Sequence, residues 1–127
     1  MALTFPAELR YADSHEYAGP SDEGIKVGIS AFAVDQLGDI VFVELPDAGT
    51  EVSKDEEVVV IESVKAASDI LAPIDGEIVE VNEAIVDNPA MVNDDPQGEA
   101  WFFKMKASDP SQMDDLMDEA GYKDFIG

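Results

Sequence analysis

The sequence predicts a mainly β protein, a flattened barrel-sandwich with short helices, one of them at the C-terminus. Short apolar runs rich in β-branched residues recur along the chain, as at residues 40–45 and 58–61, and suit pleated, half-buried strands. A turn-plus-strand pattern occurs twice, at 46–52 and 73–79, with Pro leading Gly by three positions and Val by six. This repeat suits two quasi-symmetric halves wrapped into one flattened barrel.

Length and composition indicate one domain. The chain has 127 residues, of which 46% are hydrophobic, enough for a sizeable core. We expect an N-terminal segment at 1–24, a β-sandwich core at 25–106 and a C-terminal helical segment at 108–127. No apolar run approaches ~18 residues, so no membrane-spanning helix is expected. The first residues lack the features of a signal or transit peptide, which predicts a cytoplasmic protein.

The charge is strongly acidic. There are 29 Asp and Glu against 7 Lys and Arg, a formal net charge of −22, and the acids are spread along the chain. This charge repels nucleic acid and anionic membranes, so neither is an expected partner. We interpret it as a halophilic adaptation; the competing interpretation is an acidic binding protein that acts on a basic partner. The absence of cysteine excludes disulfides, thiolate catalysis and Cys-based zinc sites.

The N-terminal half contains three predicted strands and one helix. Residues 8–19 begin with a short strand candidate and carry His15, for which we predict a structural or hydrogen-bonding role because no second His and no Cys could complete a transition-metal shell. A turn at 20–24 leads to a strand at 25–30 and then to a short helix at 31–38, which Gly38 ends and which Ser30 or a neighbouring residue could cap. The apolar run at 40–45 predicts a central strand.

The C-terminal half alternates strands and turns before it becomes helical. A charged turn at 53–57 leads into a strand that ends at 62, and a second strand covers 78–81. A helical turn is predicted within 82–88, an irregular segment around 88–98, and a last strand at 100–106. Ser108-Asp109-Pro110 predicts a helix start. Met113, Leu116 and Met117 have the spacing of the helix's inner face, and residues 122–126 add a last turn.

Residues 62–69 read as a β-hairpin with Lys65 at or near its tip. The stretch is polar, lies between two apolar strands, and places Val64 and Ala66 beside the lysine. These neighbours leave little bulk to keep another protein's active site from the amine. A solubilising turn lysine is the commoner explanation of such a residue, and spacing alone leaves both interpretations open.

The residues around Lys65 resemble the lipoylation hairpin of the glycine cleavage system H protein family. The resemblance continues in the family's order over most of residues 9–126, through Ser14-His15-Glu16-Tyr17, the blocks at 28–33, 36–46, 62–66 and 73–89, and the stretch from Val92 to Trp101. Each segment alone is a weak signal, whereas their joint occurrence is specific. One departure is Tyr17, where the family usually has Trp.

The resemblance implies a carrier that is not itself an enzyme. Lys65 would carry lipoic acid in amide linkage. Glu62 would help the lipoyl-attaching enzyme to recognise the hairpin; the alternative is that Glu62 only starts the hairpin. The implied function is to shuttle the aminomethyl group of glycine from a pyridoxal-phosphate-dependent glycine decarboxylase (P protein) to a folate-dependent aminomethyltransferase (T protein), with reoxidation by dihydrolipoyl dehydrogenase (L protein). Ser14, Glu16 and Asp69 match the positions that would hold the loaded arm, although they could equally be a turn cap and solvated surface acids. A monomer is expected.

Three alternatives share the predicted fold. Biotin carriers usually have Met on both sides of the lysine, and the lipoyl domains of 2-oxoacid dehydrogenases usually have Asp before it, whereas Lys65 lies between Val64 and Ala66. An H-like protein that relays lipoyl groups to other acceptors stays open. Autonomous catalysis is not expected, because the sequence shows no nucleophile–base pair, metal cluster or phosphate loop.

Overall fold

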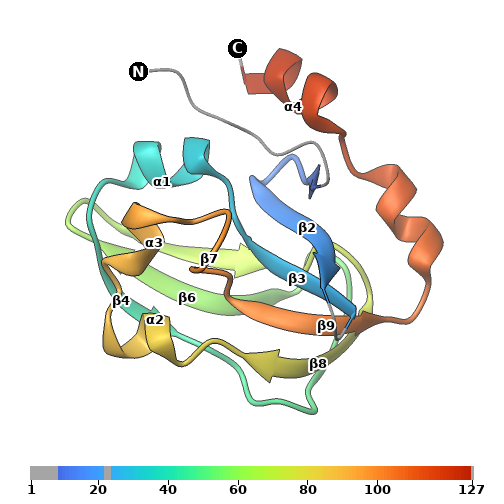
Figure 1. Cartoon of the computed structure of the whole chain (residues 1–127), viewed down its shortest axis with the longest axis horizontal. Helices are drawn as coiled ribbons and strands as arrows, with labels where there is room; N and C mark the ends of the chain where they lie inside the picture. The colour runs from blue at the N-terminus through green and yellow to red at the C-terminus, as the bar shows by residue number, and fades with distance from the viewer. Residues whose placement is uncertain (1–8, 22–23, 127) are drawn as a thin grey trace.

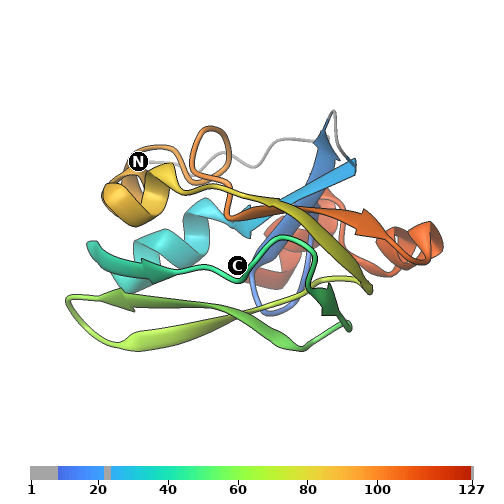
Figure 2. The same cartoon turned by 90° about the horizontal axis from the view of Figure 1, so that it is seen from below.

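A computed structural model, which describes residues 9–21 and 24–126, shows two antiparallel sheets packed face to face (Figures 1 and 2). The larger sheet has the strand order β1-β2-β3-β9-β8-β5, and the smaller one has the order β4-β6-β7. The strands are β1 (Arg10–Tyr11), β2 (Glu16–Ser21), β3 (Gly24–Ile29), β4 (Ile40–Glu44), β5 (Glu51–Val52), β6 (Glu57–Ser63), β7 (Ala67–Leu71), β8 (Gly76–Val81) and β9 (Phe103–Ala107). The mainly β prediction is therefore confirmed.

The helices are short and lie at the margins of the sheets (Figure 1). They are α1 (Ala31–Leu37), α2 (Ala84–Asp87), α3 (Met91–Asp94), the 3₁₀ helix η1 (Pro110–Asp115) and α4 (Glu119–Ile126). Ser30 caps α1 as predicted, because its Oγ accepts a hydrogen bond from the Ala33 N–H at 3.2 Å. Within the described ranges, no helix is long and apolar enough to cross a membrane.

The core lies between the two sheets and follows the period-two pattern of the strands. Each sheet contributes buried apolar side chains, most of them β-branched or aromatic, among them Val27, Ile29, Val59, Ile61, Ile70, Ile78, Phe103 and Met105. A second, smaller cluster joins the N-terminal strands to α4. In it the Tyr11 and Tyr122 rings stack with their centroids 4.6 Å apart.

The two turn-plus-strand copies lie against each other. The first copy ends in β5 and the second begins β8, and these strands pair antiparallel with Glu51 opposite Glu77 and Val52 opposite Gly76. The repeat seen in the sequence is thus a contact in the structure, as expected for two halves of one flattened barrel.

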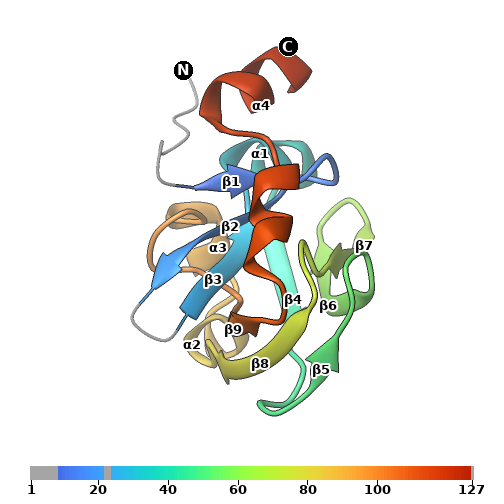
Figure 3. The same cartoon turned by 90° about the vertical axis from the view of Figure 1, so that its right-hand side faces the viewer.

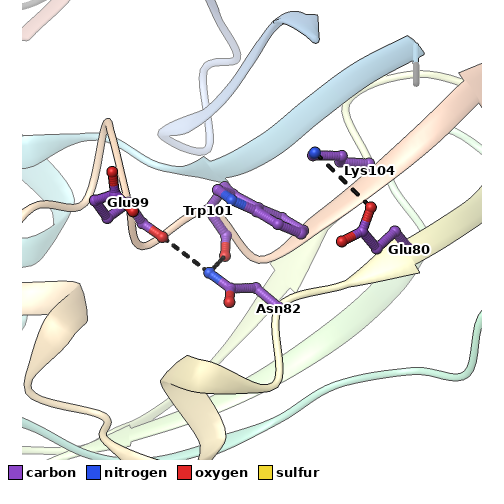
Figure 4. Close-up of polar contacts among 5 residues, drawn as sticks. All are labelled: Glu80, Asn82, Glu99, Trp101 and Lys104. Atoms are coloured by element: carbon purple, nitrogen blue, oxygen red, sulfur yellow. Dashed lines mark hydrogen bonds and ion pairs between the residues drawn. The ribbon is translucent and has the colours of Figure 1, made fainter. Parts of the chain in front are cut away.

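A polar network fixes the approach to β9 (Figure 4). The buried Asn82 Nδ2 donates to the carbonyl oxygens of Glu99 and Trp101 at 2.9 and 2.8 Å. Lys104 Nζ lies 4.8 Å from the centroid of the Trp101 ring and 3.8 Å from Glu80 Oε1. These contacts hold the segment before β9 against the end of β8.

Two strand predictions need correction. The apolar run at 40–45 forms β4 at the edge of the smaller sheet, and β6 takes the central position. Accordingly Val41 and Phe42 are exposed. The strand predicted at 100–106 begins only at Phe103, because residues 99–101 are held by Asn82.

Two loop predictions also need correction. β2 continues through Ser21 and β3 begins at Gly24, so these two residues and Pro20, predicted to be in a turn, belong to strands. Residues 22–23 of the predicted turn lie outside the described ranges. The segment around 88–98, predicted as irregular, contains α3, while the helical turn predicted within 82–88 is α2.

The helix start predicted at Ser108-Asp109-Pro110 is confirmed, because the Asp109 side chain accepts a hydrogen bond from the Ser111 N–H, but the α-helix predicted to continue through Met117 is wrong. Residues 110–115 form the 3₁₀ helix η1, and the backbone is extended at Leu116. Met117 and Tyr11 exchange two backbone hydrogen bonds of 2.8 Å, which a continuous α-helix would not allow. The C-terminal α-helix starts at Glu119 and packs beside β1, as Figure 3 shows.

Candidate functional site

Lys65 lies in a tight turn that joins β6 to β7. The last strand pair is Glu62 opposite Ala67, and the Ser63 N–H donates to the Ala66 carbonyl at 2.8 Å. The Ser63 Oγ accepts from the N–H groups of Lys65 and Ala66, each at 3.1 Å. A serine hydroxyl that bonds nearby backbone groups stabilises a turn, so Ser63 holds the tip in one shape.

The tip is fully accessible. Val64, Lys65 and Ala66 are all exposed, and Lys65 belongs to no ion pair among the described residues. Glu62 is exposed three positions earlier and lies opposite Phe42 on β4. The amine can therefore be reached by another protein's active site, as the sequence predicts.

The loop at 38–40 holds the tip of the Lys65 hairpin in place. The Val64 N–H donates to the Asp39 carbonyl at 3.0 Å. Asn93 on α3 holds that loop with two hydrogen bonds: its Oδ1 accepts from the Ile40 N–H and its Nδ2 donates to the Gly38 carbonyl, both at 2.8 Å. α3 thus positions the hairpin through the loop at 38–40.

Gly38 has a backbone conformation that favours glycine, with φ 79°. A Cβ built on it would lie 3.5 Å from Lys65 Cε and 3.7 Å from Val64 Cγ2. These are ordinary contact distances, so a side chain at position 38 would pack against the stem of Lys65, and the backbone conformation is what disfavours it. The sequence shows Gly38 as a helix end, but it gives no signal that the residue lies under Lys65.

A cleft of about 310 Å³ lies between α1 and β7. Leu37 and Gln36, next to Gly38, line the part of this cleft formed by the end of α1. Ser14, His15 and Asp69 line it as well. Two of the three residues predicted to hold a loaded arm, Ser14 and Asp69, are thus brought to one cleft.

Glu16 lies behind the cleft wall. It is buried with 1% of its surface exposed, and burial raises its pKa to about 7 against the opposing effect of its hydrogen bonds. Its Oε1 accepts from the Ser14 hydroxyl and its Oε2 accepts from the Leu71 N–H at 3.3 Å. The carboxyl therefore contacts the cleft through Ser14 and anchors the end of β7.

His15 joins the cleft to the C-terminal helix. Its Nδ1 and the Tyr122 hydroxyl are hydrogen-bonded at 2.8 Å, and the same hydroxyl lies 2.7 Å from Ser30 Oγ. Burial lowers the pKa of His15. The Phe32 ring lies beside the imidazole with the centroids 5.1 Å apart. The hydrogen-bonding role predicted for His15 is present, but the sequence does not reveal its partner 107 residues away.

Over the described residues, no group of three or more His, Cys, Asp or Glu side chains is arranged to hold a metal ion. The chemical feature of the site is the exposed lysine on a braced hairpin beside a cleft. A two-sheet β fold that presents such a lysine is the architecture of a lipoyl or biotinyl carrier domain, which offers a lysine-borne group to other enzymes.

Comparison with known proteins gives the family. The family model described as "Glycine cleavage H-protein" matches residues 9–127. A glycine cleavage system H protein of Synechococcus sp. (strain RCC307) is 62% identical over 122 residues, which cover 96% of this chain and 94% of the relative. Another glycine cleavage system H protein, of Parasynechococcus marenigrum (strain WH8102), is 53% identical over 122 residues, which cover 96% of this chain and 95% of the relative.

A solved structure agrees with these matches. The crystal structure of a glycine cleavage system H protein from Mycobacterium marinum superposes with a TM-score of 0.86 at 36% identity, covering 97% of this chain and 99% of that one. The chain belongs to the glycine cleavage H-protein family, the lipoyl carriers of the glycine cleavage system. The predicted barrel-sandwich fold and the predicted family are both confirmed.

Proposed function

We propose that this protein carries lipoic acid in amide linkage on Lys65 and presents it in turn to glycine decarboxylase, aminomethyltransferase and dihydrolipoyl dehydrogenase. The observation that carries the proposal is the braced, exposed tip at Lys65 in a member of this family. Lipoic acid, when attached, supplies a dithiolane on a flexible arm that can accept a one-carbon unit on sulfur as the disulfide is reduced. The protein is then a carrier component and not a catalyst.

The residues around Lys65 fit this attachment. The compact side chains of Val64 and Ala66 and the absent side chain of Gly38 leave room for a lipoyl-attaching enzyme to enclose the lysine. We assign Glu62 as a recognition contact for that enzyme, because it is exposed on the strand that leads to the tip. The Ser63 hydroxyl and the Asp39 carbonyl keep the tip in one conformation, which lowers the entropy cost of binding.

The cleft between α1 and β7 is the proposed resting place of a loaded arm. Leu37 and Phe32 supply apolar surface for the hydrocarbon stem. Ser14 and Asp69 supply polar groups for a protonated amine at its end. Glu16 acts there through its hydrogen bond to Ser14. A cleft of this kind would exclude bulk water from the loaded group.

The test is the modification state of Lys65. Intact mass and peptide mapping of protein isolated from its host should show a single lipoyl adduct on Lys65. With a lipoyl-attaching enzyme in vitro, Lys65→Arg should block the adduct, and Lys54→Arg, at another exposed turn lysine, should not. A biotin adduct, or an unmodified Lys65 in cells whose other lipoyl proteins are modified, would overturn the proposal.

The use of the carrier is tested separately. The lipoylated protein should support glycine decarboxylation by the decarboxylase of its host. If it instead only passed lipoyl groups to other proteins, it would be a relay protein and the glycine cleavage assignment would fail. A cytoplasmic location stays a prediction from the sequence, which cell fractionation would check.

A further inference from the structure

A groove between α2 and β4 gathers apolar side chains at the surface. Its volume is about 520 Å³, and its apolar lining includes Phe42, Leu45, Pro46, Val81 and Val86. Phe42 is 42% exposed and Val86 is 43% exposed. Single exposed apolar residues are ordinary on a monomer, whereas apolar side chains that share one groove offer a partner a continuous contact. We call this feature the α2–β4 groove.

Carboxylates surround the apolar lining. Glu44, Asp47, Glu83 and Asp87 line the same groove and are exposed, and no lining residue is basic. In the part of the chain that the structure describes, none of these four acids belongs to an ion pair. The groove therefore combines apolar surface with uncompensated negative charge.

The groove begins beside the Lys65 hairpin. Phe42 lies opposite Glu62 on the neighbouring strand β6, three residues before Lys65. The Val64 N–H also bonds to Asp39, just before β4. Figures 1 and 2 both place the hairpin tip, the start of β4 and α2 at the same end of the molecule. A protein that receives the Lys65 arm would approach this end.

We propose that the α2–β4 groove is a docking surface for an enzyme that receives the Lys65 arm, and that it takes an apolar side chain flanked by lysines or arginines. This inference rests on the proposed carrier function and deepens it. The apolar contact supplies affinity, and the acidic rim sets orientation and speeds encounter with a basic surface. A second copy of the chain would bring another net charge of −22, and an anionic membrane would also be repelled.

The charge part of the proposal is tested with matched double variants. Glu83→Gln with Asp87→Asn removes two charges from the groove, and Glu51→Gln with Glu77→Gln removes two from the β5–β8 pair that lines a different cleft. Each protein is lipoylated and used as the varied substrate of the host's decarboxylase, aminomethyltransferase and dehydrogenase. We expect the groove variant to raise KM about three- to tenfold with at least one enzyme at low salt, with kcat unchanged. The rise should disappear in high salt, and the β5–β8 variant should stay within about twofold of wild type.

The apolar part is tested at Val86. Val86→Ser should raise KM with the same enzyme at both low and high salt, because it removes apolar contact and not charge. Val86→Ile keeps the apolar surface and should behave as wild type. Thermal denaturation of both variants verifies that they are folded.

The outcomes separate the two proposals. If lipoylated wild type turns over normally and the groove variants match their controls, the docking surface is wrong and the carrier function stands. If none of the three enzymes uses the lipoylated wild type, the carrier function fails and the docking proposal fails with it. A wild-type dimer in sedimentation velocity that Val86→Ser converts to monomer would assign the groove to self-association and also overturn the proposal.

Discussion

Glu16 is a buried carboxyl whose contribution to stability depends on its protonation state. Desolvation raises its pKa from 4.5 to about 7, so the folded protein holds this proton more tightly than the unfolded chain does. Hydrogen bonds from Ser14 and Leu71 favour the charged form but do not outweigh burial. Near neutral pH the residue is thus close to the midpoint of its titration.

The first prediction concerns this titration. Below pH 4.5 Glu16 is protonated in both states; as pH rises toward 7 only the unfolded chain loses the proton, so the native state loses stability. The unfolding free energy of wild type relative to Glu16→Gln should fall by about 1 to 3 kcal/mol across this window and level off above it. Urea unfolding at a series of pH values measures the difference. Parallel curves for the two proteins would contradict the raised pKa.

Asn93 is the residue that braces the carrier hairpin, and a second prediction follows. Asn93→Ala removes two hydrogen bonds to the loop at 38–40 and should cost about 1 to 3 kcal/mol. The Val64 amide, which bonds to that loop, should also exchange with deuterium faster relative to the core amides. Asn88→Ala, at an exposed asparagine at the end of α2, is the control. Unchanged Val64 exchange would mean that Asn93 serves stability alone.

The sequence predicts Lys65 as the attachment site because the residues next to it form a recognisable local motif. The residues that hold its hairpin in place are distant in the chain and carry no such motif. Asn93 acts on a loop 53 residues earlier, and contacts of that separation leave no local pattern. Ser14 lies in a turn and Glu16 begins β2, and nothing in the local sequence indicates that Ser14 lines a cleft while Glu16 is buried behind it. The hydrogen bonds by which Ser63 stabilises the turn are typical of serine in turns, so this role could have been predicted from the sequence.

At the scale of elements, the strands were predictable where β-branched runs meet turn residues. The hairpin of β6 and β7 and the strand β3 follow this rule. The helix α1 was predictable from its cap at Ser30 and its end at Gly38. The position of β4 in the sheet could not be predicted in this way, because its continuous apolar run is typical of a central strand, whereas β4 lies at the edge of the smaller sheet. Phe42, exposed in β4, lines the α2–β4 groove instead.

The C-terminal segment shows the limit of periodicity. Met113, Leu116 and Met117 have helical spacing, yet Met117 bonds to Tyr11 in an extended backbone. That pairing occurs because β1 is the edge strand of the larger sheet and Tyr11 lies beside Met117, although the two residues are more than 100 positions apart in the chain. α4 then begins after Asp118, whose Oδ1 accepts from the Gly121 N–H at 2.8 Å.

This cap gives a third prediction. Asp118→Ala should lower the unfolding free energy by about 1 kcal/mol, because it leaves a helix N–H group without its acceptor. Asp124→Ala removes the same charge from the last turn of α4, where the helix dipole disfavours an acid, and should be neutral or slightly stabilising. Chemical denaturation of both variants decides the point. Equal losses would show that charge, and not capping, controls α4.

At the scale of the whole molecule, negative charge is compensated by few ion pairs. Over residues 9–21 and 24–126 the pairs are Lys104–Glu80 and Lys123–Glu119, against 29 acidic residues in the chain. Some acids even face each other, as Glu51 and Glu77 do across β5 and β8. Repulsion of this kind destabilises the compact state most at low ionic strength.

A fourth prediction tests the interpretation of the charge as salt adaptation. Transfer from dilute buffer to molar potassium chloride should raise Tm by several degrees, because salt screens the repulsion. Glu51→Lys changes the net charge from −22 to −20 and replaces a like-charge pair by an opposite one, so its Tm should be higher in dilute buffer and should gain less from salt. Differential scanning calorimetry measures both. A wild-type Tm that salt leaves unchanged would contradict the interpretation.

The network around Asn82 gives the molecule an optical reporter. Trp101 is the single tryptophan of the chain, half-buried beside Lys104 at the approach to β9. Its fluorescence will therefore change when the larger sheet opens, with no overlapping emission from another indole. Loosening of the Lys65 hairpin lies outside its surroundings and should leave the emission unchanged. The Trp101 fluorescence therefore reports global unfolding and is insensitive to movements of the Lys65 hairpin.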